Sequence, residues 1–164
     1  MGRTLFRVAG TSIFAVYLGG CARMSSPGFP PPARPGFLVP SDFETTFASL
    51  SMMVEARGMP VLVSDSDFGS IQTDWVNWDE GEVDLDSVAR CDLPPGAPPV
   101  RTRARFSFDV RRRANRATVT IRTQWQAELR AGFGQGNRGY VDCPSTGEWE
   151  RMVEQALTQR ATIR

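Results

Sequence analysis

Apolar and polar residues alternate one by one along two segments of this chain, and the alternation predicts a pair of β-strands. In Arg101–Val110 the apolar residues occupy even positions, and in Ala117–Leu129 they occupy odd positions. Because successive side chains of a strand point to opposite faces, one face of this pair packs and the other is exposed. The intervening Arg111–Arg116 is expected to form the hairpin tip, with Asn115 suited to a positive φ.

Apolar residues recur at helical spacing on either side of this strand pair. A first helix is predicted to begin at Ser41, where Ser41 and Glu44 match a capping box, and to stop at Gly58. A second is predicted to begin near Ser145, with Ser145 and Glu148 as its capping box. The apolar stripes are Phe43, Phe47, Leu50 and Val54 in the first helix and Trp149, Met152, Val153, Ala156 and Leu157 in the second.

Two more strands are predicted between the first helix and the alternating pair. They span Pro60–Ser64 and Ser70–Trp78, with the polar turn Asp65–Gly69 between them. Residues 79–100 are interpreted as an irregular connection and residues 131–142 as a glycine-rich loop. The predicted fold class is therefore α+β: helix, four-stranded antiparallel sheet, helix, with both helices on one face of the sheet in a helix-grip-like arrangement.

Residues 1–20 have the composition of a bacterial secretory signal peptide. Two arginines precede a largely apolar run, Val8–Gly20, and Leu18-Gly19-Gly20-Cys21 resembles a lipobox, at which bacterial lipoproteins are diacylated on the cysteine and cleaved before it. The alternative is an uncleaved membrane anchor. A helix over Val8–Gly20 would measure about 20 Å, whereas a bilayer core is about 30 Å thick. We therefore expect a lipoprotein held in the lipid bilayer through acylated Cys21.

The expected location is the periplasmic side of a bacterial membrane. Ala22 follows the cysteine where an Asp would hold a lipoprotein at the inner membrane of enteric bacteria, which favours the outer membrane. Residues 21–40 contain the lipidated cysteine and a proline-rich tether, interpreted as an extended spacer. Residues 41–164 are expected to form a single domain.

The three cysteines form an odd number, which needs an explanation in an exported protein. Lipidation of Cys21 leaves Cys91 and Cys143, and export to an oxidising compartment predicts a disulfide between them. The alternative is a pair of buried free thiols. Two cysteines without a histidine make a poor zinc site, so no metal is expected there.

The composition excludes several kinds of catalytic chemistry. The chain has no His, which rules out Ser-His-Asp and Cys-His sites. All 19 basic residues are Arg, and the absence of Lys rules out Schiff-base and Ser-Lys chemistry. Carboxylate pairs for glycoside hydrolysis stay open as an alternative, as does calcium binding by the acids of 65–67 and 79–86. The glycines of 132–139 do not lead directly into a helix, as a dinucleotide loop would. We expect a non-enzymatic protein without a cofactor.

Acidic and basic residues are segregated along the chain. Residues 65–86 carry eight acids and no Arg, whereas residues 101–130 carry nine Arg and two acids. One interpretation is that the two charge types pair across the wet face of the sheet. The other is a surface for an acidic protein or anionic headgroups, which the exported location favours over nucleic acid, so no nucleic-acid partner is expected. The candidate partner-binding residues are Arg103, Arg105, Arg111, Arg112, Arg113 and Arg122.

The order of predicted elements resembles the helix-grip domains of BamC, the lipoprotein of the outer-membrane β-barrel assembly machinery. The resemblance is carried by the lipobox at 18–21, the proline-rich segment, and the run Gly-x-Pro-Val-x-Val…Gly-x-Ile-x-Thr-x-Trp at 58–75. The cysteine pair and the single domain depart from BamC, which has two such domains. We expect an accessory or scaffolding subunit of a membrane protein complex. The alternative is a carrier that holds a lipid or another apolar ligand between helices and sheet.

Overall fold

The structure is a computed structural model of the 164-residue chain. It describes residues 30, 32–78, 84–93, 99, 101–128 and 139–162. The expected signal peptide, Cys21 and the first part of the tether lie outside the described residues, and so do residues 79–83, with three of the acids, and most of the glycine-rich loop.

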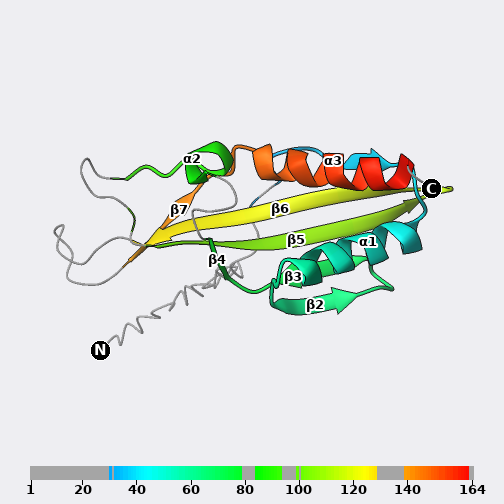
Figure 1. The fold of residues 1–164 in the computed structure, drawn as a ribbon, viewed down its shortest axis with the longest axis horizontal. Coiled ribbons are helices and arrows are strands. Elements are labelled where there is room, and N and C mark those ends of the chain that lie inside the picture. Colours follow the sequence, from blue (N-terminus) through cyan, green and yellow to red (C-terminus); the bar gives the residue numbers. More distant parts are fainter. Residues whose placement is uncertain are drawn as a thin grey trace, which may run out of the picture.

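Two long antiparallel strands, β5 (Arg101–Arg113) and β6 (Arg116–Glu128), form the centre of the fold (Figure 1). They pair over their whole length, so that only Ala114 and Asn115 lie between them. The turn is therefore shorter than the predicted tip Arg111–Arg116, because the arginines of that segment continue the strand pairing. Backbone hydrogen bonds do not require an apolar side chain, so the alternation in the sequence ends before the strands do. The positive φ, 53°, falls on Ala114 rather than Asn115.

Among the described residues the sheet has seven strands, which corrects the prediction of a four-stranded sheet with one helix before it and one after it in the chain. Its order is β1-β6-β5-β3-β2, with β4 also on β5 and β7 also on β6. Each central strand has 13 residues and is long enough to pair with two short strands in succession. The short strands are β1 (Phe37–Val39), β2 (Val61–Asp65), β3 (Ser70–Thr73), β4 (Val76–Trp78) and β7 (Tyr140–Cys143).

Local backbone chemistry explains two of the differences from the prediction. The predicted strand Ser70–Trp78 is divided at Asp74, whose carboxylate accepts a hydrogen bond from the Trp75 amide at 2.7 Å. Such local bonds compete with a strand ladder. β1 lies within the expected tether, where Phe37–Val39 is a proline-free stretch whose amides can pair with β6. The last part of the tether thus belongs to the sheet.

In the described part of the chain three helices accompany the sheet instead of two: α1 (Phe43–Ala56), α2 (Leu85–Val88) and α3 (Glu148–Thr162). The predicted capping box of α1 does not form. The N-cap is Asp42, whose carboxylate accepts from the Thr45 amide at 2.7 Å, and this bond lowers the pKa of Asp42 below its ordinary value. Glu44 instead pairs with Arg112.

The start of α3 also differs from the predicted box. Glu148 pairs with Arg151, one turn further along the helix. The Ser145 hydroxyl is 2.9 Å from a carboxylate oxygen of Glu150, which also accepts from Thr123 at 2.6 Å. Glu150 is 3% exposed, so these hydroxyls replace the water that its carboxylate loses on burial. The hydrogen bonds fasten the first turn of α3 to β6.

Aromatic side chains fill the space between the sheet and α3. Trp149 stacks on Phe106 with 4.1 Å between ring centroids, and Trp125 meets Trp78 edge-on at 4.8 Å. The Trp125 indole N–H has no hydrogen-bond partner within the described part of the chain. Both α1 and α3 lie over this apolar face. The contact between Trp149 and Phe106 places α3 there. Phe43 of α1 contacts Arg112, which projects from the same side of β5 as Phe106 and so places α1 on that face too.

Cys91 and Cys143 form the predicted disulfide. It joins the segment that follows α2 to the end of β7. Next to it, the Thr146 amide donates to the Val88 carbonyl at 3.0 Å, and Ala89 forms a bridge with Ser145. The disulfide and these backbone contacts together fix the position at which the chain enters α3.

Candidate functional site

The face of the β5–β6 hairpin that points away from α1 and α3 carries five of the six arginines predicted to bind a partner. Odd-numbered residues of β5 and even-numbered residues of β6 share this open face, because each pairs across the ladder with the other set. It divides into an inner part, in which the arginines have partners within the chain, and the end at the two-residue turn. Arg112 lies on the opposite face.

Arg103 is held between two aromatic rings in the inner part. Its guanidinium carbon lies 3.5 Å from the ring centroid of Tyr140 and 4.3 Å from that of Trp75. Its Nε and Nη2 donate to Gln126 Oε1 at 2.9 and 2.7 Å. Gln126 in turn donates to Asp142 at 2.7 Å, which links β5, β6 and β7. The cation–π contacts and hydrogen bonds fix this guanidinium in one orientation.

Arg105 and Arg122 also have partners on the open face. The Arg105 Nε donates to Gln124 at 2.7 Å, and its guanidinium lies 5.0 Å from the Trp75 ring centroid. Arg122 forms an ion pair with Asp109 on the neighbouring strand. In the inner part of the open face, glutamines, aromatic rings and one aspartate therefore engage these arginines.

The arginines at the end of the hairpin are different. Arg111, Arg113 and Arg116 are exposed on the open face, and none of them forms an ion pair with another described residue. Arg113 and Arg116 lie directly opposite each other in the ladder, whereas Arg111 lies opposite Thr118. Like charges in directly opposed positions are destabilising. We call Arg111, Arg113 and Arg116 the basic tip.

Arg112 contacts two residues of α1 within the same domain. One of its nitrogens is 2.6 Å from Glu44 Oε1, and its guanidinium lies 4.2 Å from the ring centroid of Phe43. The hydrogen bond from Arg112 lowers the pKa of Glu44 below its ordinary value of 4.5. Both side chains are 64% exposed, so solvent screens the pair and its contribution to stability is small. Arg112 thus connects the hairpin end to the start of α1.

The sequence interpretation missed Trp75, Tyr140 and Arg116. The sequence pattern predicts one strand over both Trp75 and Trp78, and nothing in their spacing identifies Trp75 as an aromatic ring that contacts arginine. Tyr140 lay in the expected glycine-rich loop. Arg116 was treated as part of a turn, but a two-residue turn would have placed it opposite Arg113. The signal for Arg116 is the register of the hairpin: a two-residue turn at Ala114 and Asn115 places it opposite Arg113.

Across the described ranges, no three His, Cys, Asp or Glu side chains gather where they could hold a metal ion. The described helices include none with the length and apolar character needed to cross a membrane. A groove of about 560 Å³ runs beside Pro30, Pro32 and Ala33 and reaches Trp125 and Pro144. Another groove, of about 540 Å³, is lined by residues of both α1 and α3, among them Thr46, Met52 and Leu157.

No protein-family model matches this chain, and a comparison with curated proteins finds no significant match.

Proposed function

We propose that this protein is a non-catalytic, lipid-anchored subunit of a membrane protein complex, facing the periplasm and docking through its basic tip onto an acidic protein surface. The observation that carries the proposal is the set of three exposed guanidinium groups without an ion-pair partner among the described residues. Arg113 and Arg116 are directly opposed, at a cost that a carboxylate-bearing partner would relieve. The anchor in this proposal is the lipobox cysteine, Cys21.

The position of the basic tip in the hairpin favours a protein as its partner rather than the lipid headgroups of the membrane that holds the anchor. Pro30, the first described residue after the anchor region, lines a groove together with Trp125 of β6. Ten strand positions separate Trp125 from Asn115 in the turn, a distance of about 33 Å along the strand. The chain therefore enters the domain near one end of the hairpin and presents the basic tip at the other.

The packed interior supports docking rather than transport of an apolar ligand. Trp149 lies against Phe106 at stacking distance and Trp125 against Trp78, so aromatic rings fill the space between the start of α3 and the sheet. The groove that α1 and α3 line together has polar side chains in its wall, among them Asp42, Thr45 and Arg160, which suit an apolar ligand poorly. Both Trp125 and Trp149 are nearly fully buried. Binding at an exposed arginine surface requires no such cavity.

The test is co-purification of the full chain from solubilised membranes. Reversal of the tip by Arg111→Glu, Arg113→Glu and Arg116→Glu should lower the yield of co-purifying protein by about tenfold or more, and added salt should lower it for the unaltered chain. The control is Arg90→Glu, at an exposed arginine that forms no described ion pair. An undiminished yield from a folded tip variant would contradict the proposal. Release of the unaltered chain by anionic vesicles would point to headgroups instead.

A further inference from the structure

The sheet has a free edge at β2, a strand whose pairing with β3 shifts register between Val61 and Val63 and is regular from Val63 to Asp65. β2 ends the strand order, and no described strand lies on its outer side. Alternate residues of an edge strand direct N–H and C=O groups outward, ready to pair with another chain. β2 also lacks the positively charged side chains with which many proteins block such an edge, since its sequence is Val-Leu-Val-Ser-Asp.

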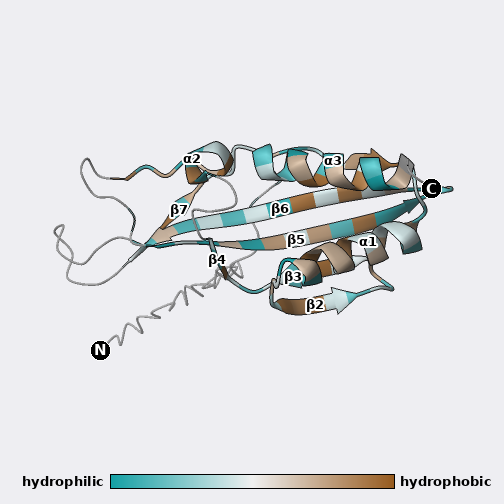
Figure 2. Cartoon of the chain, in the orientation of Figure 1, coloured by the Kyte–Doolittle hydropathy of each residue, from teal (hydrophilic) through white to brown (hydrophobic). Residues whose placement is uncertain are grey.

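The side chains along this edge are apolar and exposed. Leu62 is 62% exposed, Val61 44% and Val63 43%, and Phe68 in the following turn is 71% exposed. Figure 2 shows the first half of β2 in the brown of hydrophobic residues. Single exposed apolar residues are ordinary on protein surfaces, whereas a contiguous group indicates an interaction site. We call Val61, Leu62, Val63 and Phe68 the β2 edge.

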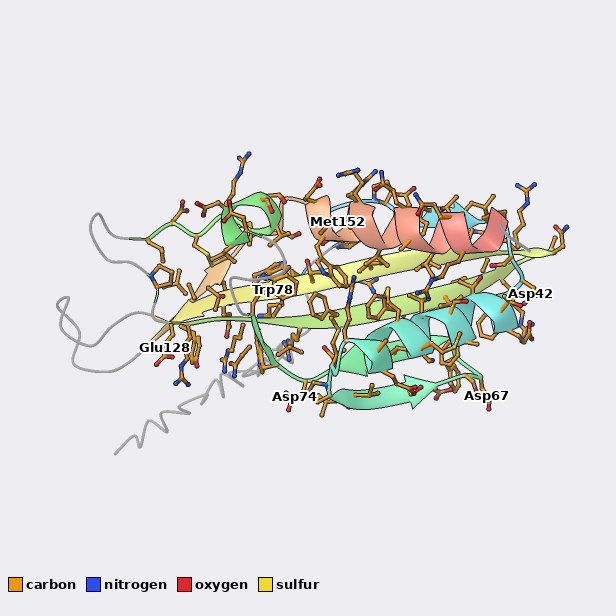
Figure 3. All side chains as sticks on the ribbon, viewed as in Figure 1. Asp42, Asp67, Asp74, Trp78, Glu128 and Met152 are labelled. Atoms are coloured by element: carbon orange, nitrogen blue, oxygen red, sulfur yellow. A yellow bond between two sulfur atoms is a disulfide. The ribbon has the colours of Figure 1, made fainter. Side chains whose placement is uncertain are left out.

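Carboxylates border the β2 edge at both ends. Asp65 is the last residue of β2 and Asp67 lies in the turn that follows, whereas Asp74 lies at the start of β2, where its amide donates to the Pro60 carbonyl at 2.8 Å. Figure 3 shows Asp74 and Asp67 at opposite ends of β2. None of these three acids forms an ion pair within the described part of the chain. The edge thus combines a hydrophobic centre with negative ends.

The charges favour one occupant over another. In a two-fold antiparallel pairing of two copies, the Asp65 end of each β2 would approach the Asp74 end of the other, bringing carboxylates together at both ends. An extended segment with apolar and basic side chains would instead meet opposite charge at both ends. We propose that the β2 edge binds such a segment of a partner protein as an added antiparallel strand. This inference is independent of the basic tip.

The experiment uses the full chain in lipid nanodiscs and labelled peptides as probes. The first peptide alternates Val and Arg, the second alternates Val and Glu, and the third is the first with a central proline that prevents strand pairing. Fluorescence anisotropy measures affinity, and amide hydrogen exchange locates the bound peptide. The Val-Arg peptide should bind about tenfold or more tightly than either of the others and should protect amides of β2.

Leu62→Arg should lower the affinity for the Val-Arg peptide by about tenfold, because the substitution places a positive charge in the β2 edge. The matched control is Met52→Arg, which changes another exposed apolar residue, on α1, and should leave the affinity unchanged. Absence of binding, equal binding of the Val-Glu peptide, or protection confined to other segments would overturn the proposal. A dimer of the full chain that Leu62→Arg abolishes would show that a second copy covers the edge, and would overturn it as well.

Discussion

The opposed pair Arg113 and Arg116 predicts that charge reversal at one of them stabilises the fold while it weakens docking. Directly opposed like charges cost about 0.2–1 kcal/mol, and opposite charges contribute a similar amount. Arg113→Glu replaces the first with the second, so we expect a gain of about 1 kcal/mol in the free energy of unfolding. For a domain of this size that corresponds to an increase of about 4 °C in Tm.

The assay is thermal unfolding of Arg113→Glu, Arg116→Glu and the double variant, with the disulfide intact. Each single variant should gain stability, and the double variant should return close to the original Tm because two carboxylates again face each other. The gain should shrink in 1 M salt, where the screening length is about 3 Å. Arg111→Glu makes the same charge change opposite Thr118 and should alter Tm less. If both single variants lose stability, or the double variant gains the sum of the two, the electrostatic reasoning is refuted.

Three further predictions concern stability. Replacing Cys91 and Cys143 by Ser should cost about 4 kcal/mol in denaturant unfolding, since the bond closes a 52-residue separation; an unchanged midpoint would contradict this. Ala114→Gly should stabilise the hairpin by about 1 kcal/mol in the same assay, because Ala114 has a φ of 53°. The hydrogen bond from the Thr45 amide lowers the pKa of Asp42 below its ordinary value of 3.8. The ionised carboxylate therefore stabilises the fold above pH 3.8, and this stabilisation is lost as the pH falls through the lower pKa of the folded state. Asp42→Asn should flatten the acid limb of a Tm-against-pH curve, and an unchanged limb would show that the cap does not titrate as described.

The sequence predicted the central hairpin well because burial imposes strict alternation. Phe106 and Phe108 on β5 and Val119 and Ile121 on β6 all lie on the packed face, and each is buried. The three strands it did not separate or detect, β1, β4 and β7, have three or four residues each. Their pairing depends on the length of β5 and β6, which is a long-range property. A short segment carries no periodicity from which to predict it.

The candidate site was only partly predictable for a similar reason. The sequence indicated a basic hairpin, but it could not show that Arg103 lies between Trp75 and Tyr140, since these rings come from segments far apart in the chain. The capping boxes failed because their glutamates found arginine partners: Arg112 for Glu44 and Arg151 for Glu148. Local motifs predict local bonds, and side chains from elsewhere in the fold compete for the same groups.

Site-specific photo-crosslinking in living cells tests most directly whether the basic tip docks onto a protein. A photoreactive amino acid replaces Ala114, between the tip arginines, and as a control replaces Gln155, an exposed residue of α3. We predict one discrete protein adduct from position 114, absent from position 155, and lost when Arg111, Arg113 and Arg116 are changed to Glu. An adduct that persists after this charge reversal, or crosslinking at position 114 to lipid alone, would contradict docking of the tip onto an acidic protein surface.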